Sequence, residues 1–324
     1  MIAPSLPLRF YPRDSKPNMP MKFQLTGLVA ATHTPFHTDG SLNLAIVASQ
    51  AAHLQRTGVS TAFIGGTTGE SSSLTFEERR QLTQRWMEVT AGTPLKVVVH
   101  VGSNCIADSS ALAAQAGQLG AAAIATLAPS YFKPHTLGLL IDCCAAIASA
   151  APRTPFYFYD IPTFTGVQFA MPDFLAQAAA RIPTLVGLKF TNADLMSYQL
   201  CRHANRGKFD ILWGLDEVLL AAVSLGCTGA VGSSYNFAAP IYNRLLKAAA
   251  AGDFATARME QFRSVQLIQL LAGYGYMATA KATMTMLGVD VGPARLPNAN
   301  LTAEQIATLR KDLKKLGFFD WVKC

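Results

Sequence analysis

The segment Leu185-Val186-Gly187-Leu188-Lys189-Phe190 is a short apolar run with one lysine inside it. Its length and composition are typical of a buried strand in a parallel sheet. Because burial disfavours a charged ammonium group, a lysine in such a run is expected to be a usable nucleophile. Seen alone, Lys189 also fits a side chain that extends to solvent or forms an ion pair. Its role therefore depends on the fold around it.

Similar apolar runs recur along the chain and alternate with segments of helical periodicity, which is the pattern of repeated βα units. Eight strands are expected, at 27–32, 61–64, 96–101, 122–127, 155–159, 185–190, 211–214 and 229–231. Helices are expected between them, at 42–56, 75–90, 107–119, 136–148, 172–180, 216–225 and 240–251. This α/β pattern predicts a closed (β/α)8 TIM barrel over residues 25–252. A doubly wound sheet is the alternative, but no GxGxxG motif follows the first strand.

The two ends of the chain are expected to lie outside the barrel. Residues 1–24 contain five prolines and several basic residues without helical periodicity, so they are expected to form a flexible arm. The scarcity of acidic residues in this arm leaves an organellar address open. Residues 253–324 are expected to add three helical segments as a C-terminal helical extension.

Composition bounds the possible partners. Half of the 324 residues are hydrophobic and 15% are charged, which fits a globular protein with a large core. The longest apolar stretch, residues 137–151, contains Asp142 and is too short to span a bilayer, so no membrane partner is expected. The net charge of +7 comes from scattered Lys and Arg residues, so no nucleic-acid partner is expected.

Cysteine and histidine usage bounds the compartment and the metal chemistry. The six cysteines include no CxxC pair, which favours reduced thiols and a cytoplasmic location. The six histidines do not stand at metal-ligand spacing, so no metal site is expected. His33 and His37 are four residues apart, but Pro35 between them prevents the helix that would bring them onto one face.

In a (β/α)8 barrel the active site lies at the C-terminal ends of the strands, so polar residues at those ends are candidates. The segment 65–70 (GGTTGE) offers a tight turn with free N–H groups and two hydroxyls, which suits a carboxylate. Tyr159 ends the fifth strand, where a phenol beside an amine can move protons. GLDE at 214–217 and GSSYN at 232–236 follow the last two strands. Each segment alone also fits an ordinary turn, a core aromatic residue or a helix cap.

Together these segments resemble the N-acetylneuraminate lyase group of the dihydrodipicolinate synthase-like, Schiff-base-forming class I aldolases. The resemblance extends from about residue 25 to the C-terminus. The matching motifs are GGTTGE (65–70), YDIP (159–162) with TGV (165–167), GLKFT (187–191), GLDE (214–217), GAVGSSYN (229–236) and PARLP (293–297).

The resemblance implies a role for each candidate residue. Lys189 would form the Schiff base, Tyr159 would shuttle the proton, and Thr67 and Thr68 would bind the pyruvate-type carboxylate. The implied function is aldol cleavage of N-acetylneuraminate, a sialic acid, to pyruvate and N-acetylmannosamine. No metal or organic cofactor is expected, because the lysine itself supplies the electron sink. A homotetramer is also implied. Contacts with the sugar chain are implied for Thr191, Gly214, Asp216, Glu217 and Ser233.

Three alternatives stay open at this point. A pyruvate-forming aldolase for another 2-keto-3-deoxy sugar acid is one, because Asp160 stands where the family usually has Asn or His. A dihydrodipicolinate synthase-like enzyme is disfavoured, since residues 163–165 lack the arginine that the synthases carry two residues past their YNxP motif. A non-catalytic keto-acid or sugar-acid binding barrel is disfavoured because Lys189 and Tyr159 are both present.

Overall fold

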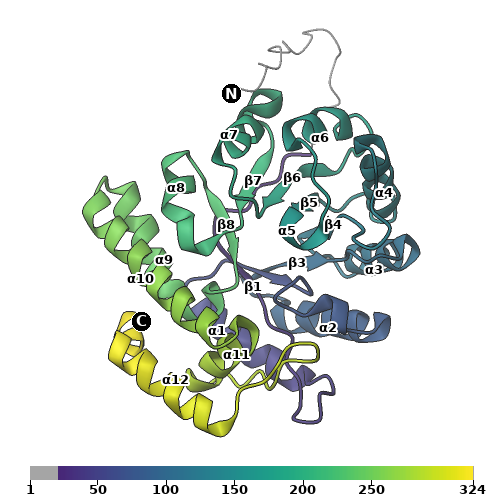
Figure 1. The fold of residues 1–324 in the computed structure, drawn as a ribbon. Coiled ribbons are helices and arrows are strands. Elements are labelled where there is room, and N and C mark those ends of the chain that lie inside the picture. Colours follow the sequence, from purple (N-terminus) through teal and green to yellow (C-terminus); the bar gives the residue numbers. More distant parts are fainter. Residues whose placement is uncertain (1–20, 324) are drawn as a thin grey trace, which may run out of the picture.

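A computed structural model describes residues 21–323 of the chain, and residues 1–20 of the predicted arm lie outside them. The sheet is a closed barrel of parallel strands whose order follows the sequence (Figure 1). The (β/α)8 prediction is confirmed, and each predicted strand end lies within one residue of the observed end. The strands are β1 (Gly27–Ala31), β2 (Thr61–Ile64), β3 (Lys96–His100), β4 (Ala123–Leu127), β5 (Phe156–Asp160), β6 (Leu185–Phe190), β7 (Asp210–Trp213) and β8 (Gly229–Gly232).

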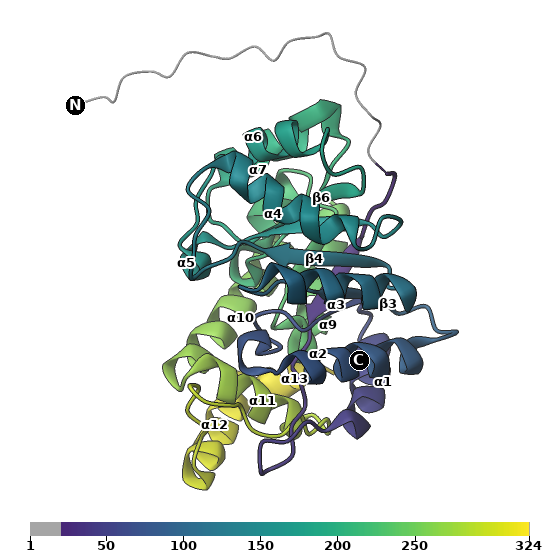
Figure 2. The same cartoon turned by 90° about the vertical axis from the view of Figure 1, so that its right-hand side faces the viewer.

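Helices surround the barrel and continue beyond it (Figure 2). None of the helices within residues 21–323 is long and apolar enough to cross a membrane. Short 3-10 helices are η1 (Leu44–Ile46), η2 (Ser71–Ser73), η3 (Ala204–Gly207) and η4 (Asp216–Val218). The α-helices are α1 (Val47–Arg56), α2 (Phe76–Thr90), α3 (Ile106–Gln118), α4 (Leu137–Ser149), α5 (Pro162–Thr165), α6 (Met171–Ala178), α7 (Leu195–His203), α8 (Leu219–Ser224), α9 (Tyr235–Ala250), α10 (Phe254–Gly273), α11 (Tyr276–Met286), α12 (Ala303–Leu316) and α13 (Phe318–Trp321).

Several helices differ from the sequence expectation, including α1, which begins at Val47 rather than at residue 42, and α5, which was not predicted. Helix α7 was not predicted, because it is short and buries only Tyr198 and Cys201, which leaves a weak apolar period. Helix α9 begins at Tyr235 rather than at Pro240. Its backbone is non-helical at Ala238, which places the break that a proline demands just before Pro240.

The helices after the barrel lie along one side of it, next to α9 (Figure 1). Three helical segments were predicted here, and the structure has α10, α11 and α12 followed by the one-turn helix α13. Helix α10 packs on α9, where Arg244 pairs with the buried carboxylate of Glu260 at 2.9 Å. Leu309 and Leu313 of α12 are also fully buried in the main hydrophobic core. The C-terminal helices are thus packed onto the barrel as part of one core.

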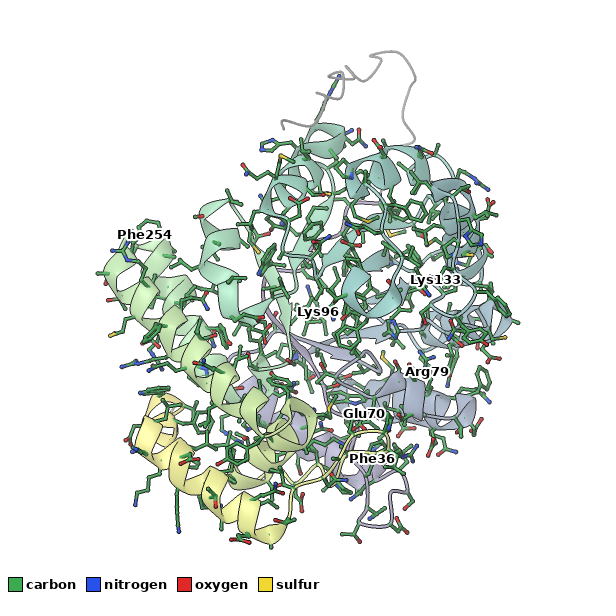
Figure 3. All side chains as sticks on the ribbon, in the orientation of Figure 1. Phe36, Glu70, Arg79, Lys96, Lys133 and Phe254 are labelled. Carbon is green, nitrogen blue, oxygen red and sulfur yellow. The ribbon has the colours of Figure 1, made fainter. Side chains whose placement is uncertain are left out.

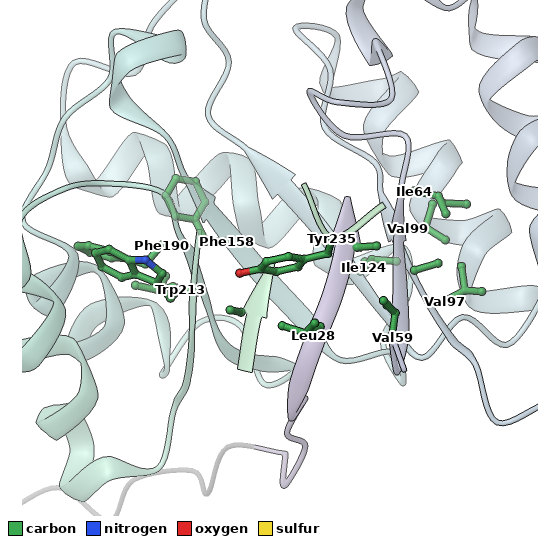
Figure 4. Close-up of a cluster of buried hydrophobic side chains, with 14 of the residues drawn as sticks. Leu28, Val59, Ile64, Val97, Val99, Ile124, Phe158, Phe190, Trp213 and Tyr235 are labelled. Carbon is green, nitrogen blue, oxygen red and sulfur yellow. The ribbon is translucent and has the colours of Figure 1, made fainter. Parts of the chain in front are cut away.

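The core has two layers that follow the alternation of the strands. An outer layer lies between the strands and the helices, and Figure 4 shows part of it, including Leu28, Val99 and Trp213. An inner layer fills the barrel. Met21 and Phe23, which precede β1, pack against this inner layer. The inner layer is closed at the N-terminal end of the strands. Open space is therefore found at their C-terminal ends.

A β-bulge in β6 decides which way Lys189 points. Phe156 pairs with Leu185 but Tyr157 pairs with Gly187, so β6 carries one extra residue. Val186 joins the inner layer while Leu188 joins the outer layer, although simple alternation would put both on one face. A Cβ atom at Gly187 would lie 1.7 Å from the carbonyl oxygen of Asp210, so only glycine fits at the bulge. The bulge turns Lys189 into the barrel.

Candidate active site

A cavity of about 730 Å³ opens at the C-terminal ends of the strands. Helices α10 and α11 complete its wall with Ile268, Tyr276 and Met277, which no signal in the sequence placed near the barrel mouth. The structure brings all of the predicted site residues together in the cavity wall. These residues are Thr67, Thr68, Tyr159, Lys189, Thr191, Gly214, Asp216, Glu217 and Ser233.

Lys189 is buried at the inner end of this cavity, with only 4% of its surface exposed. Its Nζ atom lies 3.8 Å from the ring centroid of Tyr159 and 4.2 Å from that of Phe63. No carboxylate within residues 21–323 forms an ion pair with it. Lys189 is therefore neither a solvent-reaching lysine nor one half of a salt bridge. A single amine inside a cavity is positioned to meet a bound carbonyl group.

Tyr159 lies beside Lys189 because the two residues are paired across β5 and β6. Its ring makes edge contacts with Phe63 and His100, with centroids 6.1 Å and 6.0 Å away. Its hydroxyl lies 3.4 Å from Oγ1 of Thr67. The phenol thus stands between the amine and the glycine-rich turn after β2, where it can exchange a proton with a group bound at either place.

The turn after β2 carries the two threonines of the predicted carboxylate site. Gly65 has φ of +62°, a left-handed conformation that favours glycine. A Cβ atom at Gly66 would lie 2.8 Å from the ring of Phe63, so the second glycine allows the turn to pack against the barrel. The turn is closed by a hydrogen bond from the N–H of Glu70 to the carbonyl of Thr67. Both threonine side chains line the cavity.

His100 is a cavity residue that the sequence analysis passed over. It is the last residue of β3, whereas the sequence analysis extended this strand by one residue to Val101, so His100 was not treated as a strand end. Its Nδ1 lies 2.9 Å from the carbonyl oxygen of Gly65, which identifies Nδ1 as the protonated nitrogen. Burial, with smaller effects from Arg79 and Lys189, lowers the pKa of His100 well below its ordinary value. The imidazole is neutral and supports both the turn and the ring of Tyr159.

Asp216 and Glu217 form the acidic part of the cavity wall, after β7. Oδ2 of Asp216 accepts hydrogen bonds from the N–H and the hydroxyl of Ser234, at 2.8 Å and 2.6 Å. Burial nevertheless raises the pKa of Asp216 to about 7. A Cβ atom at Gly232 would lie 2.0 Å from Oδ1 of Asp216, so the carboxyl group fits only beside a glycine. Ser233 completes this wall through a contact of 2.8 Å between its hydroxyl and that of Tyr276.

Replacing Asp216 by asparagine is expected to stabilise the protein at pH 8. The folded-state pKa of about 7 lies above the ordinary pKa of 3.8, so ionisation of Asp216 destabilises the folded state increasingly between these two pH values. The gain in Tm should be about 2–4 °C or more at pH 8 and should vanish toward pH 4. Thermal unfolding of both proteins across this range measures it. An equal Tm at pH 8 would contradict the assigned cost of burying this charge.

Asp160 lies on the other face of β5 from Tyr159, so it does not line the cavity. Its carboxylate accepts a hydrogen bond of 3.4 Å from the amide of Asn192, and its charge acts on Cys201 of α7. Burial raises its pKa to about 6. The aspartate that stands here in place of the family's usual Asn or His therefore faces α7 and does not line the cavity.

Thr191 and Gly214 form the remaining wall after β6 and β7. A Cβ atom at Gly214 would lie 2.0 Å from Oγ1 of Thr191, so the glycine leaves room for this hydroxyl. Oγ1 of Thr191 is buried and has no hydrogen-bond partner among the described residues. A polar group of this kind is expected to bind water or a ligand.

Comparison with known proteins agrees with this geometry. The pattern of the Dihydrodipicolinate synthetase family matches residues 24–316. An N-acetylneuraminate lyase of Pongo abelii is 38% identical over 304 residues, which is 93% of this chain and 95% of that protein. The mouse (Mus musculus) N-acetylneuraminate lyase is 39% identical over 301 residues, covering 92% and 94%. The structure of the Proteus mirabilis N-acetylneuraminate lyase superposes with a TM-score of 0.88 at 38% identity, covering 91% of this chain and 100% of that one.

These findings define the family and the enzyme class of the protein. The chain belongs to the dihydrodipicolinate synthetase family, whose pattern covers nearly all of it. With lyases as relatives over almost the whole length of both chains, the protein is itself a lyase of the aldolase kind.

Proposed function

We propose that this protein cleaves N-acetylneuraminate to pyruvate and N-acetylmannosamine through a Schiff base on Lys189. One observation carries the proposal: the Lys189 amine is buried without an ion-pair partner among the described residues, at the inner end of a cavity whose walls carry hydroxyl and carboxylate groups. The names of the relatives supply the substrate. A polyhydroxylated chain needs paired acceptors along its length, and Asp216 and Glu217 offer them.

The proposed reaction begins when the free amine of Lys189 attacks the C2 ketone of the open-chain sugar acid. Protonation of the hydroxyl of this adduct and loss of water give an iminium ion, which is the electron sink, and the proton is returned when the iminium ion is hydrolysed at the end of the cycle. The C4 hydroxyl then loses its proton, with Tyr159 and the substrate carboxylate as candidate acceptors. The C3–C4 bond breaks, its electron pair enters the iminium system to give an enamine, and N-acetylmannosamine leaves. Protonation of the enamine at C3 and hydrolysis release pyruvate and restore the amine.

The cavity residues are assigned to the two ends of the substrate. Thr67 and Thr68 would bind the carboxylate, since their turn supplies N–H groups and hydroxyls. The sugar chain would meet the opposite wall. Asp160 does not line the cavity, so it adds no direct contact that would favour another sugar acid as the substrate. The predicted homotetramer and cytoplasmic location stay predictions. The proposed contacts with the sugar chain are Thr191, Gly214, Asp216, Glu217 and Ser233.

Borohydride trapping tests the proposal, because it reduces an imine and fixes the substrate on its lysine. We expect N-acetylneuraminate with borohydride to leave a pyruvate-sized adduct on Lys189, identified by mass spectrometry with peptide mapping. An intact-sugar adduct would mean capture without cleavage. Labelling by pyruvate alone would retain the Schiff-base chemistry but overturn the substrate. Absence of labelling by either compound would overturn the Schiff base itself.

A further inference from the structure

Glu70, the last residue of the GGTTGE turn, is buried and strained. Its φ of +53° lies in the left-handed region, which a residue with a side chain seldom adopts. Its side chain is only 1% exposed, and Oε1 lies 2.8 Å from Nζ of Lys281, which is equally buried. A strained backbone of this kind persists only where the surroundings hold it in place. Glu70 directly continues the segment that carries Thr67 and Thr68.

Lys281 connects this turn to the C-terminal part of the chain. It lies on α11, and its Nζ also donates hydrogen bonds to the carbonyls of Thr34 and Pro293, at 3.0 Å and 2.7 Å. The ammonium group of Lys281 thus has three partners: the carboxylate of Glu70, with which it forms an ion pair, and the two carbonyl groups. Burial lowers the pKa of Lys281, and the charge of Glu70 opposes that effect. Each of the two charges compensates the other, since both side chains are only 1% exposed.

The PARLP segment, residues 293–297, is attached to the same carboxylate. The backbone N–H of Arg295 donates to Oε2 of Glu70 at 2.8 Å, and the amide of Asn298 donates to it at 3.3 Å. Phe36 lies beneath the two cations, with its ring centroid 4.3 Å from Nζ of Lys281 and 4.2 Å from Cζ of Arg295. Figure 3 shows Glu70 and Phe36 together beside the C-terminal loop. The PARLP segment is therefore hydrogen-bonded to the turn that lines the cavity.

We propose that the Glu70–Lys281 ion pair is a positioning device that holds Thr67 and Thr68 in place for the carboxylate of the substrate. It makes α11 and the PARLP segment part of the catalytic apparatus. The same helix begins with Tyr276, whose hydroxyl contacts Ser233 at the opposite wall of the cavity. Helix α11 thus contacts both walls of the cavity, through Lys281 at the turn after β2 and through Tyr276 at Ser233. The inference rests on the proposed function, in which a keto-acid carboxylate binds at this turn.

A comparison of pyruvate with acetone distinguishes an effect on the position of the turn from a general effect on folding. Both can form an imine with Lys189, but only pyruvate carries a carboxylate for the turn to hold. We expect Glu70→Gln and Lys281→Met to slow borohydride-dependent labelling of Lys189 by pyruvate about tenfold or more, because a small displacement of binding groups is costly. Labelling by acetone should stay within about twofold of the wild type. The measured quantity is the pyruvate-to-acetone rate ratio.

The double variant Glu70→Gln/Lys281→Met distinguishes positioning from simple stability. Each single variant leaves an uncompensated buried group, so both should lower Tm, whereas the double variant should recover part of it. Its pyruvate-to-acetone ratio should nevertheless stay low, because the turn is no longer tied to α11. Should a single variant fail to fold, the double variant carries the same comparison. Recovery of the ratio together with Tm would overturn the inference.

Glu78→Gln is the matched control. Glu78 pairs with the side chain of Arg295 in the same segment, and its hydrogen bonds go to Arg295 and Thr75 rather than to residues 65–70. This variant should keep the wild-type rate ratio. If it lowers the ratio as much as Glu70→Gln does, the specific role of Glu70 is overturned. A wild-type protein that labels with pyruvate while every variant keeps its ratio overturns this inference alone. A wild type that pyruvate does not label overturns the proposed function as well.

Discussion

Replacing Lys189 by methionine is expected to abolish the release of pyruvate from N-acetylneuraminate, with a loss on the order of 10⁵-fold or more. The methionine side chain fills a similar volume among the rings of Phe63 and Tyr159, so the fold should persist. Without the amine there is no imine and no electron sink for the C3–C4 bond. A coupled assay of pyruvate release measures the loss, and circular dichroism checks the fold.

Lys96→Met is the matched control for this experiment. Lys96 is also a strand lysine, but it is the exposed first residue of β3 and does not line the cavity. The same substitution there should leave pyruvate release within about twofold of the wild type, as surface changes usually do. Undiminished activity of Lys189→Met would contradict the proposed mechanism. Equal losses in both variants would mean that the assay reports folding rather than chemistry.

The barrel and its mouth could be predicted because their signals are local. Each strand is a short apolar run, and parallel strands of a barrel all end on one face. Thr67, Tyr159 and Ser233 are far apart in the sequence, yet one rule about strand ends placed them in one cavity. The same rule missed His100, because the predicted strand ran one residue past the observed end of β3.

The direction of Lys189 could not be predicted from alternation. If Val186 faces the barrel interior, a regular strand sends Leu188 inward as well and Lys189 outward. The bulge at Val186 and Gly187 reverses this, and it depends on the approach of Gly187 to the backbone of Asp210 on β7. The contact is tertiary, so no pattern within the strand records it.

The contribution of α11 could not be predicted either. Lys281 stands in an apolar helix, just as Lys189 stands in an apolar strand, and the two lysines look alike in sequence. One lies in a cavity without a carboxylate partner among the described residues, and the other is paired with Glu70. Only the packing of the C-terminal helices on the barrel distinguishes the paired cation of Lys281 from Lys189, the amine that we propose as the nucleophile.

Replacing Tyr159 by phenylalanine is expected to reduce kcat for sugar-acid cleavage about 10²- to 10⁴-fold with little change in KM. Phenylalanine keeps the ring that contacts Lys189, Phe63 and His100 but removes the hydroxyl 3.4 Å from Thr67. Imine formation should therefore continue while removal of the C4 hydroxyl proton becomes slow. Borohydride trapping with N-acetylneuraminate should then shift from the pyruvate-sized adduct toward the intact-sugar adduct on Lys189.

Tyr157→Phe provides the control, because Tyr157 lies on the same strand and also faces the barrel interior. Its hydroxyl donates to Asp210 at 2.6 Å, at the closed end of the barrel. Losing this buried hydrogen bond should lower the free energy of unfolding by about 1–3 kcal/mol and leave the adduct pattern unchanged. If Tyr159→Phe keeps the pyruvate-sized adduct and a normal kcat, the proton passes through another group. The substrate carboxylate held at Thr67 and Thr68 would then be the remaining acceptor, and the turn that Glu70 anchors would be the more important half of the site.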